Sequence, residues 1–281
     1  MDKGILIIAY GNIGYARMAY NLALSVDYYS KGLPVAIVHD GVMDKLTDER
    51  PDWQKLFKSV TTFEPKEHGR NKVELDKHTP FKHTLYIDAD SIITKDIEPL
   101  IDNCIKSGKP VLTQVHGKGG LSDSINYGIW AKNTAAWAWF DIPHDGIFQA
   151  TQTSIVYFSN KAKPIFERMR AYFNFPFKHI RHKWGRGQNI PDELIYSGVC
   201  ASLGMDIDIK IASDANRTMF FGNSQHNREN ATTITQKFYA LSFCGSSRSL
   251  NRKYLACYNA IVEPMGNAYT ANKMFNSKFV G

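Results

Sequence analysis

The sequence predicts an α/β fold with a mostly parallel sheet and helices on both faces. Continuous apolar runs, as in strands covered on both faces, alternate with segments of helical periodicity. Several of these runs end in a carboxylate or a glycine turn, and ligands of such sheets gather at the carboxyl ends of strands. With 43% hydrophobic and 22% charged residues among 281, the composition is that of an ordinary globular protein with a core.

The first half of the chain supplies the regular alternation of elements. The expected strands cover residues 5–10, 35–40, 59–63, 84–87 and 110–115. The expected helical segments cover residues 15–30, 51–57, 71–78 and 96–106. Gly32 and Pro34 end the first helix, and Asp96 is expected to cap the last one, with Glu98 and Pro99 in its first turn.

The second half is less regular. We expect a strand over 153–159, helices over 161–173 and from 191 to about 203, and a last strand over 206–211. Beyond about Asp214 the sequence becomes polar, with many Asn and Ser residues. We therefore expect residues 1–214 to form the main domain and residues 215–281 to form a C-terminal extension packed on it.

The most informative segment is His83-Thr-Leu-Tyr-Ile-Asp88-Ala-Asp90. An apolar strand runs into two carboxylates spaced i and i+2, so their side chains project to the same side. Two carboxylates that close repel unless a cation lies between them, and Mn²⁺ or Mg²⁺ prefers such oxygen ligands. A metal held by two protein carboxylates keeps positions open for phosphate oxygens, which indicates a nucleoside-diphosphate site. The alternative is that Asp88 and Asp90 only cap the loop that follows.

Three segments resemble, in order, parts of glycosyltransferases of the GT-A fold, and the resemblance covers roughly residues 4 to 205. These segments are Ala9-Tyr10-Gly11 with the helix from Tyr15, the strand 34–40, and residues 79–90 with their Asp-x-Asp motif. The resemblance implies transfer of a sugar from a nucleoside-diphosphate donor, commonly a UDP-sugar, to a hydroxyl. It also implies that a metal at Asp88 and Asp90 neutralises the leaving diphosphate.

The same resemblance suggests which residues bind the donor. Tyr10 would stack on the base and Asp40 would contact the base or ribose. Lys72 is a candidate contact of the diphosphate or ribose. The remaining donor-site candidates are Ala9, Tyr15, Asp88 and Ala89. Three alternatives remain open: Asp40 as a turn residue, Lys72 as an exposed helix lysine, and Gly11–Gly14 as a phosphate-cradling turn, although that segment lacks the GxGxxG pattern and is expected to be a loop.

Acidic residues near the end of this region are candidates for the acceptor side. Asp192 and Glu193 lie at an expected helix start, where one could act as general base or orient the acceptor hydroxyl. They could equally be ordinary first-turn acids, which the helix dipole favours. The segment 152–154 (Gln152, Thr153 and Ser154) precedes an expected strand and is a weaker candidate for the acceptor pocket.

The expected third metal ligand departs from the family's pattern. Many relatives supply a histidine from a His-x-x-Gly sequence near the C-terminus. The corresponding stretch here is Ser242-Phe243-Cys244-Gly245, with serine in place of the histidine. His226 is the nearest other candidate, and an exposed loop histidine is its alternative role.

A basic and aromatic segment bears on the acceptor. Arg and Lys residues between 168 and 186 interleave with aromatic rings, and the chain carries a net charge of +7. The basic residues are Arg168, Arg170, Lys178, Arg181, Lys183 and Arg186, the rings are Tyr172, Phe173, Phe175, Phe177 and Trp184, and a second basic group is Arg248, Arg252 and Lys253. Cations and rings together suit nucleic acid, so a hydroxylated DNA base, as in viral DNA modification, is one possible acceptor. A saccharide or lipid-linked saccharide is the broader expectation for the acceptor, and a solvated charged face is the plainest alternative role of the basic residues.

Two rival functions use the same features. A GT-A-like domain without turnover could bind a nucleotide or nucleic acid, and a nucleotidyltransferase would use the acidic pair and metal but release pyrophosphate.

The four scattered cysteines form no CxxC pair, which favours free thiols in a reducing cytoplasm over a zinc site. No run of eighteen apolar residues and no signal peptide is found, so we expect a cytoplasmic protein without a membrane span.

Overall fold

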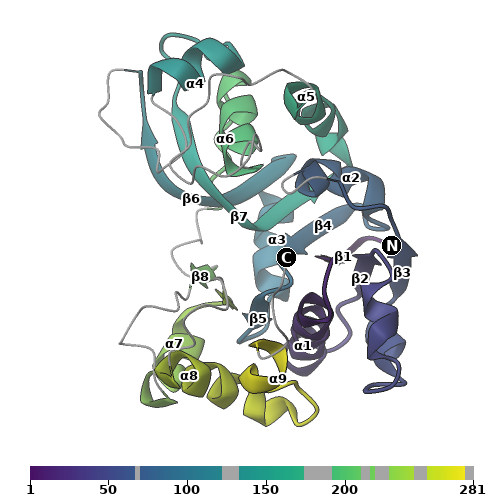
Figure 1. Ribbon diagram of the computed structural model, residues 1–281. Helices are drawn as coiled ribbons and strands as arrows, with labels where there is room; N and C mark the ends of the chain where they lie inside the picture. Colours follow the sequence, from purple (N-terminus) through teal and green to yellow (C-terminus); the bar gives the residue numbers. More distant parts are fainter. Residues whose placement is uncertain are drawn as a thin grey trace.

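A six-stranded sheet forms the centre of the molecule, as the computed structural model shows (Figure 1). The structure describes residues 1–66, 70–121, 133–173, 192–209, 216–218, 228–243 and 252–275. In spatial order the strands are β3 (Ser59–Thr62), β2 (Val35–His39), β1 (Lys3–Ala9), β4 (His83–Ile87), β7 (Phe148–Ser159) and β6 (Val111–Gly119). Strands β3, β2, β1 and β4 pair in parallel, whereas β7 is antiparallel to both of its neighbours. The predicted mostly parallel α/β sheet is therefore confirmed, with β7 as its one reversed strand.

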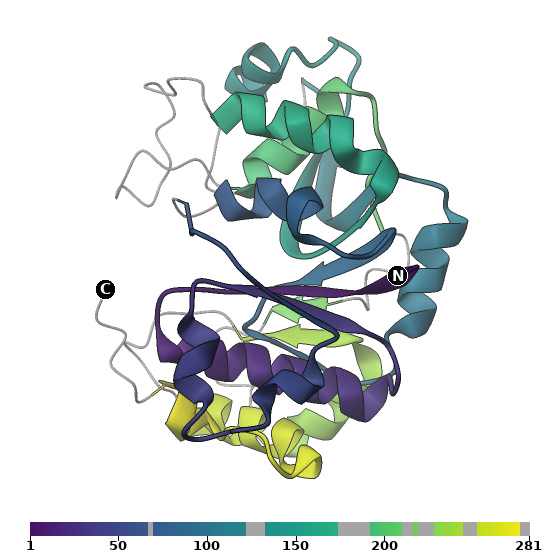
Figure 2. The same ribbon diagram turned by 90° about the vertical axis from the view of Figure 1, so that its right-hand side faces the viewer.

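Helices cover both faces of this sheet (Figure 2). Alternate residues of the central strands enter two separate cores: Ile5 and Ile7 lie in one, Leu6 and Ile8 in the other. The first core includes residues of α1 (Ile13–Tyr29) and α3 (Glu98–Lys106). The second includes residues of α2 (Leu75–His78), α4 (Asn133–Phe140), α5 (Lys163–Phe173) and α6 (Asp192–Ser202). Burial of alternate strand residues on opposite sides explains why these strands read as continuous apolar runs.

Short 3-10 turns complete the connections: η1 (Val42–Leu46), η2 (Trp53–Leu56), η3 (Arg70–Glu74), η4 (Asn160–Ala162) and η5 (Glu263–Met265). The helical segments expected over 51–57 and 71–78 are thus largely or partly 3-10. Helix α1 begins at Ile13, earlier than predicted, because the side chain of Asn12 accepts a hydrogen bond from the Gly14 N–H at 2.8 Å and caps the helix. The prediction of a loop over 11–14 is therefore wrong for residues 13 and 14, which belong to α1. Ile97, and not the predicted Asp96, is the N-cap residue of α3, although Asp96 accepts a hydrogen bond of 3.1 Å from the Glu98 N–H.

One predicted strand is wrong. Over its described part, the segment expected as a strand at 206–211 forms only an isolated bridge between Asp208 and Thr113. The Thr113 N–H donates to the Ile207 carbonyl, and the Ile209 N–H donates to the Thr113 carbonyl. Strand β6 changes register directly after Thr113, and an irregularity of this kind interrupts a regular ladder.

The C-terminal part contributes elements that the sequence did not predict. Strand β9 (Ala240–Ser242) lies between β5 (Ser91–Ile93) and β8 (Asn216–Thr218) in a small second sheet. Helices α7 (Arg228–Lys237), α8 (Arg252–Val262) and α9 (Ala271–Phe275) follow the same face as α1 (Figure 1). Asn21 of α1 holds this part, because its amide donates to the Tyr258 hydroxyl and to the Tyr269 carbonyl, and accepts from the Tyr269 N–H. Residues on both sides of position 214 therefore share one core. The expected boundary there stays a prediction.

Candidate active site

The Asp-x-Asp segment leaves strand β4 between two other parts of the chain. The Asp88 N–H donates to the Ser154 carbonyl of β7 at 2.9 Å. The Asp90 carbonyl accepts a hydrogen bond of 2.7 Å from the Phe243 N–H, directly after β9. Both carboxylates are thus attached to a backbone that is fixed from two sides.

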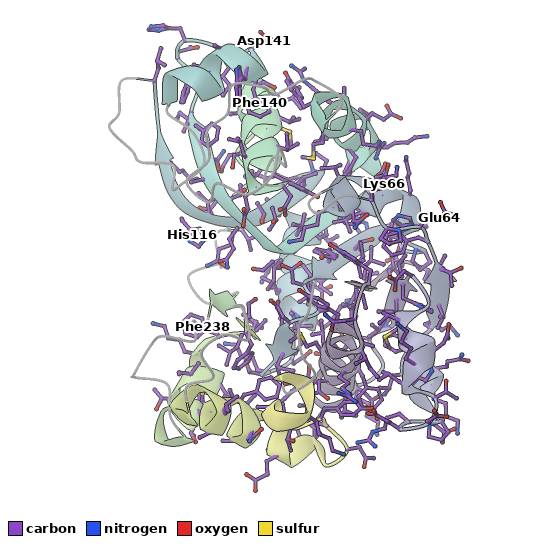
Figure 3. All side chains as sticks on the ribbon, viewed as in Figure 1. Glu64, Lys66, His116, Phe140, Asp141 and Phe238 are labelled. Atoms are coloured by element: carbon purple, nitrogen blue, oxygen red, sulfur yellow. The ribbon has the colours of Figure 1, made fainter. Side chains whose placement is uncertain are left out.

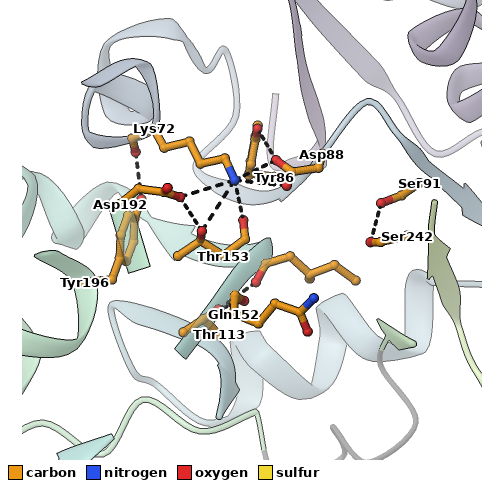
Figure 4. Close-up of polar contacts among 11 residues, drawn as sticks. Lys72, Tyr86, Asp88, Ser91, Thr113, Gln152, Thr153, Asp192, Tyr196 and Ser242 are labelled. Carbon is orange, nitrogen blue, oxygen red and sulfur yellow. Dashed lines mark hydrogen bonds and ion pairs between the residues drawn. The ribbon is translucent and has the colours of Figure 1, made fainter. Parts of the chain in front are cut away.

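Lys72, from the 3-10 turn η3, lies at the centre of the polar contacts around this segment (Figure 4). Its ammonium lies 2.9 Å from the Asp88 carboxylate and 3.2 Å from that of Asp192. Burial alone would lower the pKa of Lys72, but Asp192 and Asp88 outweigh this effect and hold the pKa well above its ordinary value. The lysine is therefore charged, and the alternative of an exposed helix lysine is wrong, since only 21% of its side chain is exposed.

The Asp88 carboxylate has a second partner, because the Tyr86 hydroxyl donates to it at 2.6 Å. Sequence reasoning missed Tyr86, although the signal was present. Tyr86 precedes Asp88 by two positions in extended chain, so the two side chains project to the same side.

Asp90 differs from Asp88 in its surroundings. Its Oδ1 atom is buried and has no hydrogen-bond partner within the described part of the chain. Burial, and next the Asp88 carboxylate, raises the pKa of Asp90 to about 7. A buried oxygen without a partner is costly, and a bound cation would remove that cost. The donor set of Asp88 and Asp90 consists of hard oxygens, so these residues fit Mn²⁺ or Mg²⁺.

The described residues supply no further metal ligand of the usual kind. Among them, no cluster of three or more His, Cys, Asp or Glu side chains could hold a metal ion. The Ser242 and Ser91 hydroxyls lie 2.8 Å apart and share a hydrogen bond. His226, Cys244 and Gly245 lie outside the described residues.

Asp192 and Glu193, at the start of α6, reach the same cluster with different charges. Burial alone would raise the pKa of Asp192, but Lys72 and a short hydrogen bond from the Thr153 hydroxyl lower it. Burial, and next Asp192, raises the pKa of Glu193 to about 8. At neutral pH Asp192 is therefore ionised, whereas Glu193 keeps its proton.

Two flanking residues complete this side of the site. Thr153, a weak candidate from the sequence, places its hydroxyl against Asp192 and within 3.4 Å of the Lys72 ammonium. The Tyr196 hydroxyl, which the sequence did not single out, donates to the Lys72 carbonyl at 2.8 Å. Gln152 instead bonds to His116, which projects from β6 (Figure 3).

The expected base-binding residues lie at the ends of β1 and β2. Asp40 accepts hydrogen bonds from the Gly11 N–H at 2.8 Å and the Val42 N–H at 3.1 Å, so it fixes two turns at once. Gly11 has a φ of +90°, which a residue with a side chain rarely adopts. The Tyr10 ring contacts Phe63 edge to face at 6.2 Å.

Electrostatic contacts bring most predicted residues into one place. Burial raises the pKa of Tyr10, and Asp88 and Asp192 add to this rise, whereas a hydrogen bond with Asn71 and the charge of Lys72 act against it. The pKa of Tyr15 is raised by burial and by Asp90. Ala9, which precedes Tyr10, and Ala89, which lies between Asp88 and Asp90, are both buried.

The described part of the basic segment gives little support for a nucleic-acid surface. Arg170 donates to both carboxylate oxygens of Asp76, at 2.5 and 3.1 Å, and to the Val73 carbonyl. The Tyr172 ring packs on Phe140 at 4.8 Å. Arg170 and Tyr172 therefore serve internal packing, and residues 174–191 and Arg248 lie outside the described residues.

No protein-family model matches the chain, and no curated protein matches it in sequence. Solved structures do match it. The bifunctional glycosyltransferase WbbM matches 98% of this chain and 52% of its own, with a TM-score of 0.59 and 12% identity. The galactosyltransferase LgtC matches 96% of this chain and 99% of its own, with a TM-score of 0.55 and 12% identity. GlyE of Streptococcus pneumoniae TIGR4 matches 98% of this chain and 63% of its own, with a TM-score of 0.53 and 10% identity.

These neighbours are glycosyltransferases of the GT-A fold, so this chain has that fold, as the resemblance implied. The chain spans about half the length of WbbM and nearly all of LgtC. No helix in the described ranges is long and apolar enough to cross a membrane. The described cysteines Cys104, Cys200 and Cys257 are free and buried.

Proposed function

We propose that this protein is a metal-dependent glycosyltransferase that moves a sugar from a nucleoside-diphosphate donor to a hydroxyl acceptor. The observation that carries the proposal is the buried Oδ1 of Asp90, which has no hydrogen-bond partner among the described residues and lies beside Asp88 at the end of β4. Such an oxygen at the carboxyl end of a parallel strand lies where ligands of α/β sheets bind. The fold is that of known nucleotide-sugar glycosyltransferases, which supports the same assignment.

Asp88 and Asp90 would hold Mn²⁺ or Mg²⁺. When bound, such an ion supplies Lewis-acid neutralisation of the charge that grows on the departing diphosphate. Lys72 adds a positive charge beside the same place, since its raised pKa keeps it protonated. Positive charge next to a leaving group on which negative charge develops can lower a barrier by several kcal/mol.

The two acids of α6 would act on the acceptor side. The oxygens of Asp192 are engaged by Lys72 and Thr153, so Asp192 orients neighbouring groups. Glu193 holds a proton below about pH 8 and can accept one above it, since its pKa is raised to about 8. We propose Glu193 as the group that contacts the acceptor hydroxyl and exchanges a proton with it.

The finer assignments belong to the same proposal. We propose a UDP-sugar as donor, with Tyr10, Tyr15 and Asp40 near its nucleoside. We propose a saccharide as acceptor in preference to a hydroxylated DNA base, because Arg170 is bound to Asp76.

The test combines a binding screen with turnover. Nucleoside-diphosphate sugars are screened with Mn²⁺ for thermal stabilisation, because a ligand that binds only the folded state raises the melting temperature. The best donor is then assayed for metal-dependent release of its nucleoside diphosphate. We expect Asp90→Asn to lower this rate by at least ~100-fold.

The matched control is Asp102→Asn. Asp102 pairs with Lys3 at the amino end of β1, on the edge of the sheet opposite to the acidic pair, and its side chain is exposed. This control should leave the rate unchanged. Nucleotide binding without any turnover, or turnover that survives Asp90→Asn, would contradict the proposal; release of pyrophosphate would identify a nucleotidyltransferase instead.

A further inference from the structure

Lys72 holds a position that bears directly on how a metal could bind. Its ammonium contacts both oxygens of Asp88, at 2.9 Å each, and one oxygen of Asp192 at 3.2 Å. It also lies 3.4 Å from the Thr153 hydroxyl and 5.8 Å from the centre of the Tyr86 ring. Two carboxylates, a hydroxyl and an aromatic ring, four groups in all, therefore favour a cation at this one place.

Asp88 has little capacity left for another cation. A carboxylate offers about four lone-pair positions in total. Lys72 contacts both oxygens, and the Tyr86 hydroxyl donates to one of them at 2.6 Å. A divalent ion that uses Asp88 must share it with a charged ammonium. Asp90, in contrast, keeps a buried oxygen free of hydrogen bonds from described residues.

The two cations also repel each other. The Lys72 ammonium lies between the carboxylates of Asp88 and Asp192, so a divalent ion at Asp88 would lie close to its charge. The chain beneath the lysine is fixed as well, since the Lys72 carbonyl accepts the hydrogen bond from Tyr196. The side chain is the movable part, and a diphosphate near the site would offer it new anionic oxygens.

We infer that Lys72 is an internal cation that competes with the divalent metal for Asp88. The metal alone then binds weakly, and metal and nucleoside diphosphate bind cooperatively, because the diphosphate attracts Lys72 away from Asp88. By thermodynamic reciprocity, each ligand raises the affinity for the other by the same factor. This inference rests on the proposed function, and it concerns the order of events at the same site.

The experiment measures Mn²⁺ binding to the whole chain without nucleotide, by the loss of the free-ion electron paramagnetic resonance signal. Lys72→Met keeps the length of the side chain and removes its charge. We expect the Mn²⁺ dissociation constant to fall about tenfold, the effect of a univalent charge on a divalent one at short range in a water-like dielectric. Lys77→Met removes an exposed charge that pairs with Glu74, three residues earlier, and should leave the constant unchanged.

Because Lys72→Met leaves Asp192 without its counter-ion, the same comparison is made in a second background. Asp192→Asn is measured with and without Lys72→Met, and the double variant should again bind Mn²⁺ about tenfold more tightly than Asp192→Asn alone. Unchanged or weaker binding in both comparisons overturns the inference, while the proposed function stands as long as Asp90→Asn abolishes Mn²⁺ binding. Absence of Mn²⁺ binding in the wild type and in every Lys72 variant overturns both.

Discussion

The sheet has a parallel half, formed by β3, β2, β1 and β4, and an antiparallel half, formed by β7 and β6 with α6 packed against β7. The two halves hold their acidic residues in different ways. In the parallel half, Asp40 accepts hydrogen bonds from the backbone N–H groups of Gly11 and Val42, which belong to nearby turns. In the antiparallel half, Asp192 is buried and faces a side chain from another part of the chain, the ammonium of Lys72. The first arrangement stabilises local structure, whereas the second joins the two halves of the site through charge.

The largest expected difference between the halves is in folding stability. Asp192→Ala removes one partner of a buried ion pair and should lower the free energy of unfolding by about 3 kcal/mol, as is typical when such a pair loses one member. Urea unfolding followed by circular dichroism measures this change. The control is Asp206→Ala, which removes an ion pair with Lys109 and Lys118 at a carboxylate that is 42% exposed and should cost at most about 1 kcal/mol. Equal losses in the two variants would contradict the contrast between buried and exposed pairs.

The pH dependence of stability gives the next largest effect. In the folded state the pKa of Glu193 is raised to about 8, so the folded protein keeps a proton that the unfolded chain releases above about pH 4.5. Stability from this group is fully present below pH 4.5 and is lost as pH rises towards 8.

Glu193→Gln should therefore flatten this decline and make the variant more stable than the wild type at pH 8, by about 2 kcal/mol. Urea titrations at pH 5, 6.5 and 8 measure the effect. The exposed Glu167→Gln on α5 serves as control and should follow the wild-type curve. Parallel curves for wild type and Glu193→Gln would show that Glu193 is ionised at neutral pH.

The smallest effect is expected in the parallel half. Asp40→Ala removes two hydrogen bonds to backbone N–H groups and should cost about 1 kcal/mol in urea unfolding, because solvent can replace a partly exposed acceptor. Asp40→Asn keeps one acceptor oxygen and should cost about half as much. A loss as large as that of Asp192→Ala would remove the distinction between the two halves.

The same difference explains what could be predicted from the sequence. Strands β1, β2 and β4 and the acidic pair after β4 were predicted because their apolar runs and their i, i+2 spacing are local patterns. The positions of Lys72 and Thr153 could be proposed only as candidates, since their contact with Asp192 depends on how β7 pairs with β4.

Other parts of the site had no usable local signal. The short strands β5, β8 and β9 span three residues each and are stabilised by pairing across long stretches of sequence. The segment 206–209 has strand-like composition, but the register change in β6 leaves it only one bridge. Composition describes what a segment can form, and its neighbours in space decide whether it does so.

The contact between Phe243 and Asp90 has a consequence for biosynthesis. The backbone N–H that holds the Asp90 carbonyl belongs to a residue that leaves the ribosome long after the acidic pair itself. Until β9 has been translated and has paired with β5, this side of the acidic loop lacks its support. A nascent chain arrested before residue 240 should therefore carry a loosely held acidic loop, so that the metal-binding geometry is completed at a late stage of translation.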